Sequence, residues 1–408
     1  MNRYIQLFKK EWKILLYGLI ITFFSSFGQT FFISLFVPVI IHNFHLTKTG
    51  FGTLYAGITL LSAINLSYFG RWIDRMPLKT YGLFIAGGLI CGSLLLSLSW
   101  FWLVLGLGLL LVRFFGQGLS SHASQTAMSR YFDADRGTAL SIASLGFPLG
   151  EGILPGLITI LLSVLAWRWV WASVSLFIVI LLVPLTIYLL HDDRFRRAPK
   201  QEDAPADENG QEWHYRDIIK DSRFYYLFLP VLLPPFLITG LFLYQISFAH
   251  DLGWSAGLIA TAFISYAISR VIGTIVSGPV IDRFTATRIF PYYLIPFGIA
   301  LAFAYWHPGD WSAFVYMFFV GITMGTGGNI KSALYAELYG VRTIGTVRSL
   351  FQSLMVFSTA ISPFLMGWLL DHNIAVTKIL LVAIAIIIFA SLLSWRLYLM
   401  EKPAYVTQ

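Results

Sequence analysis

The sequence predicts an all-α integral membrane protein in which twelve transmembrane helices form two pseudo-symmetric six-helix halves. Of its 408 residues, 57% are hydrophobic and only 12% are charged, whereas soluble domains carry about 25% charged residues. Apolar segments that can cross ~30 Å of hydrocarbon, which takes roughly 20 residues each, occur twelve times. A charged loop pattern in the first half also returns 208 residues later, from Gly70 to Gly278, as expected for a duplicated membrane bundle.

The twelve apolar segments are assigned as helices because backbone polar groups in lipid must be satisfied within their own segment. The first segment follows a basic stretch, Arg3 to Lys13, and contains no small-residue cleavage site, so it is expected to be an uncleaved spanning helix. The expected spans are 14–41, 51–70, 80–98, 101–127, 138–165, 168–190, 224–249, 255–280, 289–306, 312–338, 346–370 and 376–399.

The halves are expected at 1–190 and 223–408, joined by a cytoplasmic linker at 191–222. The linker is polar and includes an acidic, proline-bearing run, which is typical of a flexible connector. Trp213 to Arg223 is expected to form a short interfacial helix before the seventh span.

The distribution of basic residues predicts the orientation in the membrane. With the N-terminus inside, the inner segments hold 22 Lys and Arg residues, and the outer loops hold 3. By the positive-inside rule both termini are cytoplasmic, and a bacterial-type inner (plasma) membrane is the expected location. Because the basic residues are separated by apolar runs, no nucleic-acid partner is expected. A single cysteine, Cys91, excludes a disulfide framework and a cysteine-based metal site, and we expect no metal or other cofactor.

The repeated loops share glycine, aspartate and arginine at fixed spacing. The residues concerned are Gly70, Asp74 and Arg75 in the first copy and Gly278, Asp282 and Arg283 in the second. This pattern, with twelve spans and a central loop, resembles the major facilitator superfamily, whose hinge motif reads Gly-x-x-x-Asp-Arg-x-Gly-Arg-[Lys/Arg]. Pro77 and Leu78 replace that motif's second glycine and arginine. The resemblance implies a monomeric transporter whose halves rock about a central site, with Asp74 and Asp282 holding their cytoplasmic ends together.

Charged and polar residues inside the spans are the candidate site, because an ionisable group at bilayer depth costs about 2.5–3.5 kcal/mol and needs a partner or a task. Arg113 and Arg270 are candidate anion-binding residues, since a guanidinium can bind a carboxylate bidentately. Arg270 is also similar in position to an arginine of the monocarboxylate and oxalate–formate exchanger branch. The candidate polar substrate contacts are Gln29, Gln117, Gln245 and Asn329.

Glu151 is the one carboxylate expected deep in the membrane, and two interpretations of it stay open. The turn near Phe132 would place Arg113 and Glu151 at one depth on neighbouring helices. The pair is then either a protonatable carboxylate gated by an arginine or a buried structural salt bridge. Similarly, Arg270 and Lys331 either add positive charge to a cavity that attracts anions, or they snorkel or pair with Glu337.

These residues predict a secondary active transporter for a small, carboxylate-like organic anion, with a proton as a candidate symported ion carried by Glu151. No Gly-x-x-x-x-Gly-Lys-Ser/Thr loop is present, so ATP drive is not expected. An efflux antiporter for drugs or metabolites is the alternative, because Gly146 to Gly152 resembles the antiporter motif with Glu151 in a glycine position. A non-transporting receptor and a membrane enzyme are remoter alternatives. No paired carboxylates or histidine cluster favour an enzyme.

Overall fold

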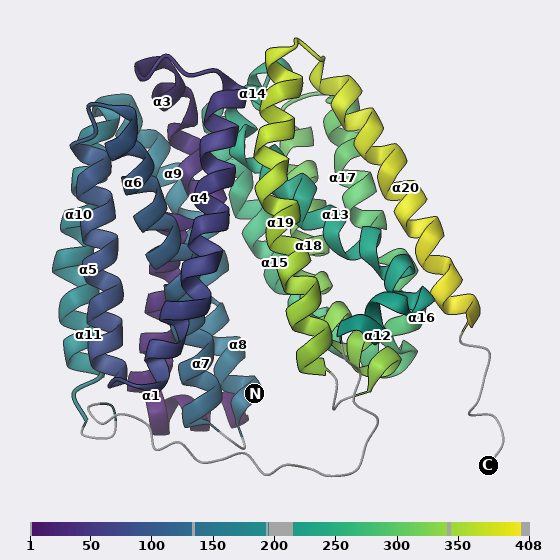
Figure 1. The fold of residues 1–408 in the computed structure, drawn as a ribbon, viewed down its shortest axis with the longest axis horizontal. Helices are drawn as coiled ribbons and strands as arrows, with labels where there is room; N and C mark the ends of the chain where they lie inside the picture. The colour runs from purple at the N-terminus through teal and green to yellow at the C-terminus, as the bar shows by residue number, and fades with distance from the viewer. Residues whose placement is uncertain (1, 133–134, 193–194, 196–214, 341–343, 401–408) are drawn as a thin grey trace. The chain divides into compact units, whose positions relative to one another are not determined.

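The computed structural model describes residues 2–132, 135–192, 195, 215–340 and 344–400, and these are helical without any strand. The chain divides into two compact units, Met1–Ala204 and Pro205–Gln408 (Figure 1). Eleven helices are long and apolar enough to span a membrane, and a bent pair, Leu7–Gly28 with Thr30–Asn43, gives a twelfth span. The predicted fold class is therefore confirmed. Most of the expected linker, residues 196–214, lies outside the described residues.

Unit 1 contains the first six spans, and several of them are interrupted rather than straight. Its elements are α1 (Asn2–Phe24), η1 (Ser25–Gly28), α2 (Thr30–Ile33), η2 (Ser34–Phe36), α3 (Val37–Asn43), α4 (Lys48–Phe69), η3 (Gly70–Asp74), α5 (Leu78–Ser97), α6 (Trp102–Val112), η4 (Arg113–Ser120), α7 (Ser121–Tyr131), α8 (Arg136–Ser144), α9 (Gly146–Val164), α10 (Trp167–Phe177), η5 (Ile178–Leu182) and α11 (Val183–Leu189).

The first helix begins at Asn2, well before the expected residue 14. Its opening turns carry lysines as well as apolar residues, so a search for apolar runs misses them. Within the unit, α1 packs against α7, α8 and α9, and α5 packs against α6 and α10. The side chain of Trp171 from α10 is fully buried and contacts the rings of Phe32 and Phe36.

Unit 2 contains the remaining six spans and a short helix before them. Its elements are α12 (Tyr215–Lys220), α13 (Ser222–Leu243), α14 (Gln245–Asp251), α15 (Ala256–Phe284), α16 (Ala286–Ile289), η7 (Phe290–Tyr292), α17 (Ile295–Trp306), α18 (Trp311–Tyr339), α19 (Ile344–Asp371) and α20 (Val376–Met400). The helix expected between residues 213 and 223 is confirmed as α12. Helix α15 packs along α18, α13 packs against α19, and α17 contacts both α18 and α20.

Three prolines lie inside α13, and neighbouring helices satisfy the backbone that they disturb. Pro234 has no N–H to donate to the carbonyl of Pro230, four residues earlier. The Tyr293 hydroxyl donates to that carbonyl instead. Ser362 of α19 also donates to the Phe236 carbonyl of α13 at 2.5 Å, which joins the two helices without replacing a bond that a proline removes. A proline-bent helix is stable in a membrane when neighbours supply such bonds.

Candidate functional site

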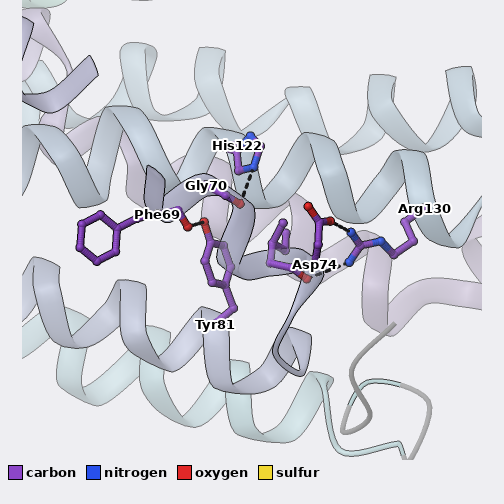
Figure 2. A network of polar contacts seen from close by, with 7 residues as sticks. Phe69, Gly70, Asp74, Tyr81, His122 and Arg130 are labelled. Atoms are coloured by element: carbon purple, nitrogen blue, oxygen red, sulfur yellow. Dashed lines mark hydrogen bonds and ion pairs between the residues drawn. The ribbon is translucent and has the colours of Figure 1, made fainter. Parts of the chain in front are cut away.

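The hinge loop of unit 1 is anchored by an arginine from the end of the fourth span. Residues Gly70–Asp74 form the 3₁₀ helix η3 directly after α4. Arg130 of α7 donates one guanidinium N–H to the Asp74 carboxylate and another to the Ile73 carbonyl, the second at 3.0 Å (Figure 2). The ion pair therefore fixes both a side chain and the backbone of the loop.

Two further hydrogen bonds hold the start of the same loop. His122 of α7 donates from Nε2 to the Gly70 carbonyl at 3.1 Å, and the Tyr81 hydroxyl of α5 lies 3.4 Å from the Phe69 carbonyl (Figure 2). A Cβ at position 70 would be in ordinary van der Waals contact with the His122 ring of α7, at 3.4 Å. The side chain of Arg75 is exposed and makes no polar contact with the described residues.

The second hinge loop continues the helix before it, so Asp282 is placed differently from Asp74. Gly278, Asp282 and Arg283 lie on the last two turns of α15, and both charged side chains are exposed. Arg283 lies over the ring of Phe284, 5.2 Å from its centroid. The Asp282 side chain makes no hydrogen bond or ion pair with the residues that the structure describes, so its predicted role in the loop stays a prediction.

Glu337, near the end of α18, anchors the second loop. Its carboxylate accepts hydrogen bonds from the Ala286 N–H at 2.7 Å, the Thr287 N–H at 2.8 Å and the Thr287 hydroxyl at 2.7 Å. It thus caps the start of α16. Among the described residues, the carboxylate of Glu337 contacts these groups and forms no ion pair with Lys331, so the alternative of a Lys331–Glu337 pair is wrong. Thr285, just before the capped turn, has φ of 66° and ψ of 152°, a conformation that β-branched residues rarely adopt.

The first span is broken at η1, where it meets a π-helical segment of the fourth span. Gln29 is extended, with φ of −78° and ψ of 152°, between η1 and α2. Residues Arg113–Ser120 form the π-helix η4. A side chain at Gly28 would lie 2.2 Å from the Val112 carbonyl oxygen, and one at Gly116 would lie 2.8 Å from the Gly28 nitrogen. The two backbones therefore pack directly on each other. Broken helices and π-bulges inside membranes are commonly placed at binding sites.

Arg113 lies at this break and contacts neutral oxygen atoms. Its side chain is 4% exposed. The guanidinium donates to the Tyr55 hydroxyl, to the Thr30 hydroxyl at 3.4 Å and to the Gly28 carbonyl at 3.5 Å, and it lies 4.4 Å from the Tyr55 ring centroid. Among the described residues none of its partners is a carboxylate, so the structure does not form the expected Arg113–Glu151 pair.

Glu151 and Gln117 lie near the same break. Glu151 of α9 is 7% exposed. A side chain at its neighbour Gly150 would overlap Ser26 of η1, so α9 crosses the first span at the level of the break. Gln117 is half-buried on η4, and its side-chain oxygen is buried without a hydrogen-bond partner among the described residues.

The candidate residues of unit 2 lie on three different helices, α14, α15 and α18, and are described one by one. Gln245 is 4% exposed, begins α14 just after the Tyr244 break, and lines a cavity of about 20 Å³. Asn329 of α18 donates to Ser277 at 2.8 Å and to the Thr274 carbonyl at 3.1 Å. Its amide nitrogen therefore joins two helices. Arg270 is half-buried on α15, one turn before Thr274.

Sequence reasoning missed Tyr55, Thr30 and Arg130. Tyr55 and Thr30 are single polar residues in apolar spans. The sequence could have indicated Tyr55 only through the rule that a buried tyrosine hydroxyl needs a hydrogen-bond partner. Arg130 follows the apolar part of the fourth span by only a few residues, so it was counted as a loop charge. Within the described ranges, no group of three or more His, Cys, Asp or Glu side chains could hold a metal ion.

Comparison with known proteins identifies the fold of the whole chain. It is similar to a bacterial homolog of the human lysosomal transporter Spinster in an inward-facing, unoccupied conformation, with 14% identity, a TM-score of 0.71, and coverage of 96% of this chain and 98% of that one. The occupied form of that protein gives 15% identity, a TM-score of 0.67, and coverage of 94% and 96%. The nucleoside transporter NupG gives 12% identity, a TM-score of 0.71, and coverage of 96% and 99%.

At these identities the structural matches establish the fold alone. No curated protein sequence matches this chain. The family profile described as Major Facilitator Superfamily matches twice, over residues 18–250 and 236–408. Neither result singles out the monocarboxylate or oxalate–formate exchanger branch. The two matches together span nearly all of the sequence, and the chain belongs to the Major Facilitator Superfamily, as a membrane transporter rather than an enzyme.

Proposed function

We propose that this transporter moves a small organic anion by alternating access, with Arg113 as the primary anion-binding residue. The observation that carries the proposal is the neutral surroundings of the Arg113 guanidinium, which is 4% exposed. Leaving a buried charge without a counter-charge is costly. A substrate carboxylate would supply the counter-charge, and Gln117 and Gln29, beside the same break, would donate further hydrogen bonds to it.

Glu151 is proposed as the proton carrier. It lies at the level of the broken first span, as Arg113 does, but on a different helix. Protonation of Glu151 would make the local charge more positive and so favour an anion, which couples proton and substrate binding. Arg270, Gln245 and Asn329 are proposed as substrate contacts of unit 2, with Asn329 contributing its carbonyl oxygen because its amide nitrogen is bound to α15.

The proposed orientation has both termini in the cytoplasm of a bacterial-type cell, with the protein acting as a monomer in the inner membrane. The excess of basic residues on that side supports it. Labelling of introduced cysteines tests it: in a Cys91→Ser background, Lys9→Cys should react with an impermeant reagent only from the inner side.

The test of the substrate class is a thermal-shift panel of monocarboxylates, dicarboxylates, nucleosides and drug-like cations, since a ligand stabilises the protein once it exceeds its Kd. Anions should be the hits. Arg113→Gln should then weaken anion binding by about 1.5–3 kcal/mol, or roughly ten- to hundredfold in Kd. Lys378→Gln, which removes an exposed cation at the start of α20, is the matched control and should bind normally.

Other outcomes distinguish the competing substrates. Hits confined to nucleosides, which NupG is named for, or to cationic drugs would refute the anion proposal. Arg270→Lys retains the charge but not the planar fork, so a direct carboxylate contact predicts a loss similar to that of Arg113→Gln. For coupling, Glu151→Gln should abolish proton-driven accumulation and preserve exchange at equal pH. A variant that accumulates substrate normally would remove Glu151 from the mechanism.

A further inference from the structure

Two adjoining cavities in unit 2 have no role in the transport mechanism proposed above. One, of about 270 Å³, is lined by Phe284, Arg288, Ile289, Pro291, Tyr292, Trp395 and Tyr398. The other, of about 140 Å³, lies beside it and shares Ile289 and Tyr292. We refer to the two adjoining cavities together as the groove, which has a polar end at Arg288 and an apolar end at Val276.

The larger cavity lies where three membrane spans end. The spans Ala256–Phe284 and Val376–Leu399 finish there, and the span Ala286–Trp306 begins there. Figure 1 places α16 beside the end of α20, and α20 contacts both α16 and η7. The cavity is thus at the level where lipid headgroups meet hydrocarbon.

The side chains of the larger cavity suit a phosphate group. Arg288 is exposed and forms no ion pair with any described residue. Two carboxylates lie on neighbouring elements, and neither forms an ion pair with Arg288: Glu337 is bound to the backbone at the start of α16, and Asp282 is exposed near the end of α15. The rings of Tyr292 and Trp395 meet edge to face at 5.3 Å, and Trp395 and Tyr398 meet at 5.9 Å. Aromatic groups with a polar tip favour this depth, and guanidinium groups bind phosphate.

The smaller cavity runs into the membrane-embedded part of the unit. It lies between α15 and α17 over α18, and its lining is mostly aliphatic and aromatic: Val276, Ser277, Val280, Ile281, Ile289, Tyr292, Tyr293, Pro296, Ile322, Thr326 and Ile330. Val276 precedes Phe284 by eight residues, about 12 Å along the helix. A soluble anion would gain nothing from this extension, whereas an acyl chain would bury its surface there.

We propose that this groove, from Arg288 to Val276, is a binding site for an anionic phospholipid. The headgroup phosphate lies at Arg288, the hydroxyl and indole groups of Tyr292, Tyr398 and Trp395 donate to its oxygen atoms, and one acyl chain fills the channel between α15 and α17. The lipid joins α15, α17 and α20, so it stabilises unit 2 whatever substrate is transported.

The experiment uses the full chain in neutral detergent, with binding of dioleoyl phosphatidylglycerol and dioleoyl phosphatidylcholine measured by native mass spectrometry and by thermal shift. The wild type should bind phosphatidylglycerol roughly tenfold more tightly, because both lipids carry a phosphate but only phosphatidylcholine adds a fixed ammonium charge that the Arg288 guanidinium repels. Arg288→Gln should abolish this preference, and Arg288→Lys should retain part of it. Arg216→Gln, an exposed arginine on α12 that lines neither cavity, is the control and should keep the preference.

Val280→Trp tests the acyl-chain channel without changing the charge. It should weaken both lipids by a similar factor while leaving Arg288 in place. Equal binding of the two lipids by the wild type, or the same loss in Arg216→Gln, would overturn the proposal. Competition by millimolar inorganic phosphate, with Val280→Trp binding phosphatidylglycerol normally, would show a site for free phosphate and likewise overturn it.

Discussion

Removal of the Glu337 carboxylate should destabilise unit 2 measurably. In Glu337→Ala, the Ala286 N–H, the Thr287 N–H and the Thr287 hydroxyl lose the oxygen atoms that now lie at 2.7–2.8 Å. Loss of a side-chain cap at a helix start costs about 0.5–2 kcal/mol. Three hydrogen bonds to a carboxylate favour the upper end of that range, and the exposure of Glu337 favours the lower end, because water can replace the lost oxygen atoms.

This free energy corresponds to a modest change in melting temperature. For 150–250 residues, 1 kcal/mol shifts Tm by about 2–4 °C, so a loss of about 0.5–2 kcal/mol lowers Tm by about 1–8 °C. The assay is thermal unfolding of the purified protein in detergent, followed by intrinsic fluorescence. Glu337→Gln keeps one carbonyl oxygen and should fall between the wild type and Glu337→Ala.

The matched control is Asp282→Asn. Asp282 is the aspartate of the second copy of the loop pattern, but its side chain makes no polar contact with the described residues. It should shift Tm by less than about 1 °C, as surface substitutions usually do. The reasoning is refuted if Asp282→Asn lowers Tm as much as Glu337→Ala. It is refuted equally if Glu337→Ala unfolds at the wild-type temperature.

Three further predictions concern other described contacts. Asp74→Asn and Arg130→Gln should each slow transport while the protein stays folded, and the double variant should be no slower than Arg130→Gln alone, since that substitution already removes the ion pair; additive losses measured in liposomes would contradict this. Thr285→Gly should raise Tm, because glycine adopts a φ of 66° without the roughly 1 kcal/mol or more of strain that threonine bears there; an unchanged or lower Tm would show that the turn is unstrained. Burial would raise the pKa of the Asp221 carboxyl, but hydrogen bonds from Arg223 and its charge outweigh burial and lower that pKa. This stabilisation is therefore present above the ordinary aspartate pKa of about 3.9 and lost as pH falls below it, so the Tm values of Asp221→Asn and wild type should differ at pH 7 and converge near pH 3.

The fold was predictable because hydropathy acts over whole segments. Twenty apolar residues determine a span whatever their order, and the repeated loop located the two halves. The breaks within the spans could not be predicted from the sequence in this way. Nothing in the sequence Ser25–Gly28 requires a 3₁₀ turn, and its geometry follows from the packing of Gly28 on η4, which is far away in the chain.

The sequence identified the buried charged residues Arg113 and Glu151, but it did not identify the contacts that Arg113 makes. Arg113 and Glu151 were found because buried charges are rare in a membrane. Their pairing was inferred from depth alone, and depth does not specify which face of a helix a side chain occupies. Arg113 instead bonds to Tyr55, which lies on α4, a helix that the pairing argument did not consider. The sequence repeat suggested that Asp282 would hold its loop, although more weakly than Asp74. It gave no sign of the contacts between Glu337 and the Ala286 and Thr287 amides.

The direct contact between the backbones of Gly28 and Gly116 fixes the spacing of the first and fourth spans at Arg113 independently of the side chains there. Because two backbones set the spacing there, the side chains around Arg113 do not determine it. Substitutions at Thr30 or Tyr55 could therefore change which molecule is accepted without moving the helices, whereas any side chain at Gly28 or Gly116 would force them apart. A protein built this way can acquire new substrates by few substitutions, and the two glycines mark the positions that directed evolution of its specificity should leave unchanged.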